Sequence, residues 1–246
     1  MKVGKVLDSG KNKSRRGLLL GLAGLSAVAW GWQRFGVREA ALKFQPIPDL
    51  PGWRLAETGA VSGGGATDAV FLGIGDETSK PLAPEILCET LYSRPGPGVA
   101  VAVFTDINCP NCRSLEAKLA ARTDGLTLTW LQLPRLGPGS VVAARVAVAA
   151  SLLGGVPPSP PGALRGTGVA SLVRFHAARA RIAPEALEAE VDSLRVTEIL
   201  EIHAGAAETL GVWGTPAMTI GKTLVMGDMS EDRLDQLLEM EHPACG

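Results

Sequence analysis

Hydrophobic positions in the middle of the chain follow two different periods and predict a strand–helix–strand unit. Residues 99–105 form a continuously apolar run, typical of a strand buried on both faces. Residues 126–133 alternate between apolar and polar, the period of a half-buried strand. Between them Leu115 and Leu119 share one face of a helix that extends to about residue 122. Such a unit is a right-handed crossover with parallel strands, at the centre of an α/β sheet.

The pattern around this unit predicts mostly helices, followed by a hairpin. Helices are expected at 84–92, 140–153 with Ser140 as a cap, 169–181, 184–194 and 196–210, with Gly211 ending the last. Residues 217–220 and 223–226 flank Gly-Lys, the composition of a hairpin, and a final helix starts at Ser230. Short strands are expected at 53–55 and 69–74, and the Pro-rich stretch 154–168 is expected to be an irregular connector.

The first 34 residues have the pattern of an export signal. Residues 1–16 carry six basic side chains and one aspartate, and residues 17–32 carry no charge. A basic head before an apolar stretch, with Ala27-Val28-Ala29 as a candidate cleavage site, is typical of a secretory signal. Arg15-Arg16 is also similar to a twin-arginine signal. Either export route places the rest of the chain outside the cytoplasm, which in a bacterium is the periplasm.

We expect this segment to remain as an uncleaved inner-membrane anchor, with a cleaved signal peptide and a soluble periplasmic protein as the alternative. Sixteen helical residues span roughly 24 Å, somewhat less than the roughly 30 Å hydrocarbon core of a bilayer. Trp30 and Trp32, however, suit a membrane–water boundary.

Composition and charge limit which kinds of protein this chain can be and which partners it can bind. Of 246 residues, 46% are hydrophobic and 20% charged, which supports a folded core. The net charge is −1, and because the basic residues concentrate at the start, the rest is acidic, which disfavours nucleic acid as a partner. We expect a basic head with a signal or anchor helix at 1–34, a tether with one strand at 35–68, and an α/β domain at 69–246.

The candidate chemistry lies in Cys109-Pro110-Asn111-Cys112, where the strand gives way to the helix. Two thiols at this spacing can close and open a disulfide, because the positive end of the helix stabilises a thiolate. Proline is tolerated at the first helical position, whose N–H has no partner within the helix. The motif therefore favours redox chemistry.

Metal binding is the alternative for the same motif. A four-ligand zinc site needs two further ligands, but Cys88 and Cys245 are isolated and the three histidines have no ligand spacing. The alternative function is that of a metal-handling protein that holds Cu(I) between Cys109 and Cys112, because soft thiolate ligands select that ion. Whether Cys88 and Cys245 pair as a structural disulfide stays open at this point.

The order of elements resembles the DsbA-like branch of the thioredoxin superfamily. The matching stretches are FTDINCPNC at 104–112 and LGVWGTP at 210–216, within a resemblance that covers about 69–240. The resemblance implies a thioredoxin-like fold with a helical insertion at about 137–210 and a protein thiol–disulfide oxidoreductase. It also implies a cis bond between Thr215 and Pro216 beside the disulfide, with Thr215 offering its backbone to an extended client segment.

The resemblance further implies roles for the two thiols. Cys109, nearer to solvent, would be the sulfur that a client attacks, and Cys112 would be the resolving thiol. The partners would be client proteins, a redox partner that resets the couple, and the membrane through residues 17–32. No metal and no diffusible cofactor is expected. The oxidase direction is favoured, with a reductase or isomerase as the alternative.

Two residues near these motifs, Asp106 and Trp213, have more than one possible role. Asp106 is expected to cap the turn before Cys109, and the alternatives are that it shuttles protons or that it opposes formation of the thiolate. Trp213 stands beside the Gly-Thr-Pro loop, where it either lines a substrate groove or belongs to the core.

Overall fold

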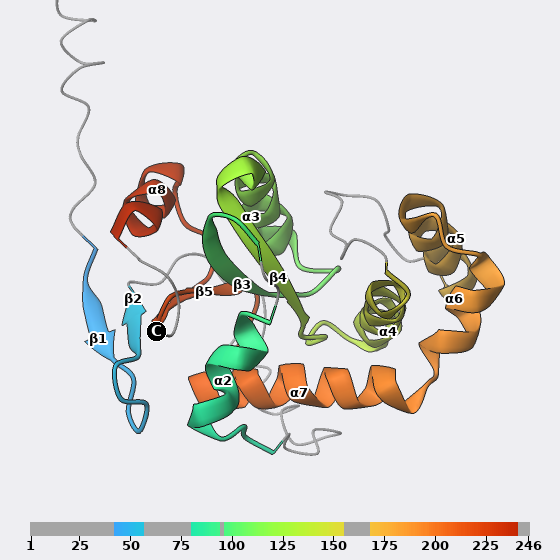
Figure 1. Ribbon diagram of the computed structural model, residues 1–246, viewed down its shortest axis with the longest axis horizontal. Helices are drawn as coiled ribbons and strands as arrows, with labels where there is room; N and C mark the ends of the chain where they lie inside the picture. Colours follow the sequence, from blue (N-terminus) through green and yellow to red (C-terminus); the bar gives the residue numbers. More distant parts are fainter. Residues whose placement is uncertain (1–41, 57–79, 94–95, 155–167, 241–246) are drawn as a thin grey trace, which may run out of the picture. The chain divides into compact units, whose positions relative to one another are not determined.

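Six strands form one sheet in the computed structural model, which describes residues 42–56, 80–93, 96–154 and 168–240. The order across the sheet is β1-β2-β6-β5-β3-β4 (Figure 1). The strands are β1 (Phe44–Pro46), β2 (Arg54–Ala56), β3 (Val99–Thr105), β4 (Leu126–Gln132), β5 (Ala217–Ile220) and β6 (Thr223–Met226). The predicted crossover is confirmed, because β3 pairs in parallel with β4 while β5 pairs antiparallel with β3 on its other side.

Helices cover both faces of this sheet. They are α2 (Pro84–Leu91), α3 (Pro110–Ala120), a 3₁₀ turn η2 (Thr123–Gly125), α4 (Pro138–Leu152), α5 (Val169–Ala180), α6 (Pro184–Val191), α7 (Leu194–Leu210) and α8 (Glu231–Met240). Leucines of α2 and α7 pack in one core layer with Phe104, whereas those of α3 and α8 pack in a second layer with Val101 and Val103. The alternation of β3 side chains between the two faces thus separates the two layers.

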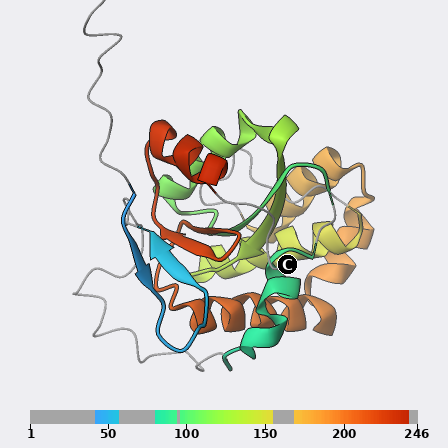
Figure 2. The same cartoon turned by 60° about the vertical axis from the view of Figure 1, so that its left-hand side comes forward.

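Residues 42–56, which the sequence assigned to a tether, add two strands to the sheet. β2 pairs in parallel with β6, Arg54 facing Thr223, and β1 pairs antiparallel with β2 (Figure 2). The Arg54 Nε donates to the Thr223 hydroxyl at 2.8 Å, and its guanidinium lies 3.9 Å from the centre of the Phe44 ring. The strand expected near Trp53 is therefore confirmed, and β1 was missed because three residues give too short a pattern.

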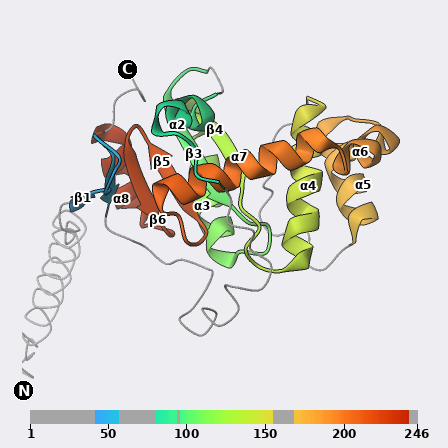
Figure 3. The same cartoon turned by 90° about the horizontal axis from the view of Figure 1, so that it is seen from below.

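The helical insertion has its own core, formed by α4, α5, α6 and the first turns of α7. α7 extends from this insertion to the sheet (Figure 3). Several predicted boundaries were wrong, including the end of α6, which lies at Val191 rather than at residue 194. α4 begins at Pro138 with Gly137 as its N-cap, so Ser140 is not the cap. α7 begins at Leu194 because the Ser193 hydroxyl accepts from the Val196 N–H at 3.2 Å.

Several predictions lie outside the described residues: the signal or anchor helix at 17–32, the strand at 69–74, most of the connector at 154–168, and Cys245. Among the residues that the structure describes, no helix combines the length and the apolar character needed to cross a bilayer.

Candidate active site

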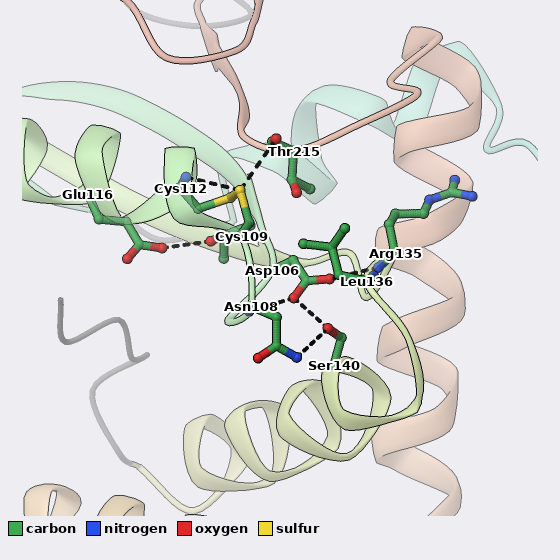
Figure 4. The surroundings of a disulfide bond; sticks show 10 residues. Asp106, Asn108, Cys109, Cys112, Glu116, Arg135, Leu136, Ser140 and Thr215 are labelled. Atoms are coloured by element: carbon green, nitrogen blue, oxygen red, sulfur yellow. Dashed lines mark hydrogen bonds between the residues drawn. A yellow bond between two sulfur atoms is a disulfide. The ribbon is translucent and has the colours of Figure 1, made fainter. Parts of the chain in front are cut away.

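The turn from β3 to α3 positions the two thiols of the C-x-x-C. Cys109 is the N-cap of α3, and its N–H donates to the Asp106 carbonyl at 3.0 Å. Cys109 and Cys112 form a disulfide with their Cα atoms 5.2 Å apart, and the Cys112 N–H donates to the Cys109 Sγ at 3.0 Å (Figure 4). The Cys109 sulfur thus receives an N–H from the first turn of a helix, which favours negative charge on it when the bond opens.

A loop from far along the chain approaches the same sulfur. Gly211 ends α7 with a φ of 72°, a left-handed conformation that glycine adopts without a steric penalty, and the chain turns back toward the sheet. The peptide bond between Thr215 and Pro216 is cis, and the Thr215 carbonyl oxygen lies 3.4 Å from the Cys109 Sγ (Figure 4). The structure therefore brings together the four residues, Cys109, Cys112, Thr215 and Pro216, that the sequence singled out.

Both sulfur-bearing residues are buried, which corrects one expectation. Cys109 was predicted to lie nearer to solvent than Cys112, but their exposed fractions are 0% and 1%. Cys109 lies between the first turn of α3 and the Thr215 backbone, and Thr215 is itself fully buried. A client thiolate can reach this disulfide only after its surroundings have opened.

Asp106 caps the turn that presents Cys109, as predicted. Its carboxylate is 2% exposed and accepts from four donors: the N–H groups of Asn108 (2.8 Å), Arg135 (2.8 Å) and Leu136 (3.0 Å), and the Ser140 hydroxyl (2.7 Å). Both carboxylate oxygens are therefore engaged in holding the backbone, which disfavours the reading of Asp106 as a proton shuttle.

Sequence reasoning missed Glu116, a buried acid in α3. Its side chain belongs to a residue that is 4% exposed, and it accepts from the Thr105 hydroxyl at 2.6 Å. Glu116 lies four residues after Cys112, so the two residues are neighbours on one face of the helix. The signal for it was this spacing, a carboxylate among the inward leucines at 115 and 119.

Trp213 lies on the surface beside the Thr215–Pro216 loop. The residue is 58% exposed, so its reading as a core tryptophan is wrong. An exposed tryptophan leaves a large apolar surface in water, and such residues are enriched where proteins bind one another.

The remaining cysteine and metal predictions concern other parts of the fold. Cys88 packs against the α2–α7 core layer and is disulfide-bonded. Cys245, with which the sequence left a pairing open, lies outside the described residues. Among the described residues, no three His, Cys, Asp or Glu side chains gather in a way that would hold a metal ion.

Comparison with known proteins supports the fold that the geometry indicates. No protein-family model matches the chain, and no curated protein matches it in sequence. Among solved structures, it is similar to a thioredoxin-like oxidoreductase from Silicibacter pomeroyi DSS-3, with 25% identity, a TM-score of 0.53, and coverage of 61% of this chain and 95% of that one.

Two more distant structures share the fold. The thiol-disulfide exchange protein alpha-DsbA2 from Wolbachia pipientis is 18% identical, with a TM-score of 0.51 and coverage of 61% of this chain and 89% of that one. Oxidised BdbD from Bacillus subtilis is 16% identical, with a TM-score of 0.51 and coverage of 67% and 97%. The predicted resemblance to DsbA-like thioredoxin-like proteins, and with it the thioredoxin-like fold with a helical insertion, is confirmed.

Proposed function

We propose that this chain, which has the fold of DsbA-like thioredoxin-like proteins, is a thiol–disulfide oxidoreductase that exchanges disulfides with other proteins. One observation carries the proposal: the Cys109–Cys112 disulfide caps α3 with the Thr215 backbone 3.4 Å from its first sulfur. The likeness to a thioredoxin-like oxidoreductase at 25% identity supports it. The Cys109–Cys112 pair and the Thr215–Pro216 loop beside it come from segments about 100 residues apart in the sequence. A disulfide with a purely structural role would not need this loop beside its sulfur.

In the oxidising direction the reaction is two exchanges of a sulfur–sulfur bond. A client thiolate attacks the Cys109 Sγ, a mixed disulfide forms, and the Cys109–Cys112 bond breaks with its electron pair on Cys112, which takes up a proton. A second client thiolate then attacks the client sulfur of the mixed disulfide, and Cys109 leaves as a thiolate. The client has lost two electrons and the enzyme has gained them, so no metal or diffusible cofactor is required.

Three groups of the chain act on these steps. The Cys112 N–H, 3.0 Å from the Cys109 Sγ, stabilises the negative charge that Cys109 carries when it leaves. Once the surroundings of the disulfide have opened, the Thr215 backbone, which is buried in the disulfide form, offers an extended client segment a single β-type contact beside the sulfur. To Glu116, which is buried one helical turn after Cys112, we assign the transfer of the proton of that thiol.

The oxidase direction and an extracytoplasmic location are further parts of the proposal. The basic head and the uncharged stretch at 17–32 favour export and tethering to the inner membrane, and disulfides persist outside the cytoplasm. The partners would be client proteins with thiols and a second redox protein that reoxidises the couple. A reductase or isomerase with the same site is the alternative.

The reduction potential of the Cys109–Cys112 couple tests both the activity and its direction. Known couples of this kind span from about −270 mV in reducing proteins to about −120 mV in strong oxidants. We expect a value less negative than about −200 mV, measured by equilibration with glutathione and quantification of the two redox forms. A value near about −270 mV would support the reductase. A protein that exchanges with no thiol under any condition would refute the activity itself.

Trp213 is expected to bind clients rather than to take part in the chemistry. Replacing Trp213 with alanine should lower the rate of exchange with a reduced protein client about tenfold, because a large exposed anchor is lost, while leaving exchange with glutathione unchanged. Leu194→Ala is the matched control, since Leu194 is 80% exposed at the other end of α7. Equal rates for the two variants with the protein client would exclude Trp213 from client binding.

A further inference from the structure

One buried carboxylate joins the C-x-x-C turn to the start of the helical insertion. Asp106 accepts from Asn108 in the turn, from the N–H groups of Arg135 and Leu136 in the β4–α4 loop, and from Ser140 in α4 (Figure 4). The Ser140 hydroxyl also accepts from the Asn108 side-chain amide at 2.8 Å. Three segments that are separate in the sequence are therefore held by one side chain.

The start of α4 lies against the turn that presents Cys109. The Asn108 side-chain amide donates to the Ser140 hydroxyl at 2.8 Å, and a Cβ atom added at Gly139 would come to 3.6 Å from the same amide nitrogen, so little space separates the two segments. The Asp106 carbonyl accepts the Cys109 N–H at 3.0 Å, so the same residue holds the turn through its backbone and through its side chain. Any displacement of Asp106 would move Cys109.

Within the described part of the chain, the donors that hold the charge of Asp106 are all neutral. Its four partners are three backbone N–H groups and one hydroxyl, and among the described residues no lysine, arginine or histidine forms an ion pair with it. Hydrogen bonds from neutral groups lower the free-energy cost of burying a carboxylate, but they do not cancel its net charge. A negative charge therefore remains beside the turn that carries Cys109, where low solvent exposure leaves it poorly screened.

We propose that Asp106 is a positioning residue that also sets the redox balance of the Cys109–Cys112 couple, an inference that rests on the proposed function. The α3 N-terminus stabilises the Cys109 thiolate and so favours the reduced enzyme. The Asp106 carboxylate acts in the opposite sense, because it repels a thiolate in the same turn and favours the disulfide. The reduction potential of the Cys109–Cys112 couple is therefore more negative than it would be if only the N-terminus of α3 acted on the Cys109 thiolate.

The redox balance of charge variants tests this inference. Reduction by glutathione oxidises two glutathione thiols to one disulfide, and the two electrons break the Cys109–Cys112 bond. Asp106→Asn removes the charge and should raise the equilibrium constant for this reduction about tenfold, or about 30 mV for a two-electron couple. The Cys109 thiolate, followed by its ultraviolet absorbance, should form at lower pH in the variant than in the wild type.

Ser140→Ala is the matched control, because it removes one hydrogen bond to Asp106 but keeps the charge. It should lower the thermal stability while leaving the glutathione equilibrium within about twofold of the wild-type value. Since the amide of Asp106→Asn would place a donor against the Arg135 and Leu136 N–H groups, Asp106→Ser provides a second variant without charge and without this conflict.

The outcomes separate the two proposals. If a folded Asp106→Asn or Asp106→Ser protein keeps the wild-type equilibrium, or if Ser140→Ala shifts it as far as they do, the electrostatic role of Asp106 is wrong. Failure of both Asp106 variants to fold would count against that role too, since it would show a purely structural residue. A wild-type protein that does not exchange with glutathione would instead refute the proposed function.

Discussion

Replacing Cys112 with serine is expected to trap mixed disulfides between Cys109 and client proteins, and replacing Cys109 is expected to trap none. Without the Cys112 thiol, the mixed disulfide loses the group that resolves it from within the enzyme, so it persists. The prediction rests on the proposed role of Cys109, whose Sγ receives the Cys112 N–H and lies beside the Thr215 carbonyl. The measurement is a non-reducing gel of each variant after alkylation in cells.

The buried position of Cys109 makes this result informative about access as well as about roles. Because the residue has no exposed surface in the disulfide form, trapping requires the site to open to a client. The variant lacking both Cys109 and Cys112 controls for any product formed through Cys88 or Cys245. Products formed by Cys109→Ser but not by Cys112→Ser would reverse the assigned roles.

A loss of about 3 kcal/mol of folding stability is expected between pH 7 and pH 4 from His203 alone. β4 is an edge strand, and the Gln132 N–H at its end donates to the His203 Nδ1 at 3.1 Å. At this sheet edge the imidazole accepts the hydrogen bond that a neighbouring strand would otherwise accept. To accept it through Nδ1, the ring must be neutral and carry its proton on Nε2. Burial is the main cause of the low pKa of His203, which lies at about 4.

The sign of the effect follows from proton binding. In the unfolded chain histidine has a pKa of about 6.5, so below that pH the unfolded state binds a proton that the folded state does not. Stability from this group is therefore complete above about pH 6.5 and is lost as the pH falls toward about 4. Each unit of pKa difference is worth about 1.4 kcal/mol, which gives about 3 kcal/mol in total.

His203→Asn isolates this contribution. An asparagine Oδ1 can occupy the place of the imidazole Nδ1 and accept from Gln132, but it does not titrate. The pocket of about 160 Å³ beside His203 is lined, within the described part of the chain, by residues without charge such as Thr129, Ser151 and Ile199. Urea unfolding at several pH values should show a shallower loss of stability in the variant than in the wild type. Parallel curves for both proteins would exclude His203 as the titrating group.

Local patterns were sufficient to predict most elements of the fold. β3 has the predicted bounds, 99–105, because a strand buried on both faces is apolar throughout. The hairpin of β5 and β6 follows in the same way from two short strands around Gly221-Lys222. The end of α7 at Gly211 was also predictable, because a glycine after a helical pattern adopts the left-handed conformation there.

Contacts between distant segments could not be read from these patterns. The donors around Asp106 come from a loop and a helix about 30 residues further along the chain, and no local periodicity records such an arrangement. β2 joins the sheet through pairing with β6, about 170 residues away, and β1 joins through β2, so each three-residue strand gains its stability from a partner rather than from its own sequence.

The sequence alone was enough to indicate the candidate chemistry of this protein: two thiols at the start of a helix, a Gly-Thr-Pro loop far downstream, and the crossover that carries them. Residue types and short-range spacing are sufficient for that, because helix starts and buried strands have local signatures. Only the tertiary structure decided that Cys109 is fully buried, that Trp213 is exposed, and that Glu116 and Asp106 are buried acids near the disulfide. Burial and long-range hydrogen bonding depend on how separate elements pack, and packing is a property of the whole fold.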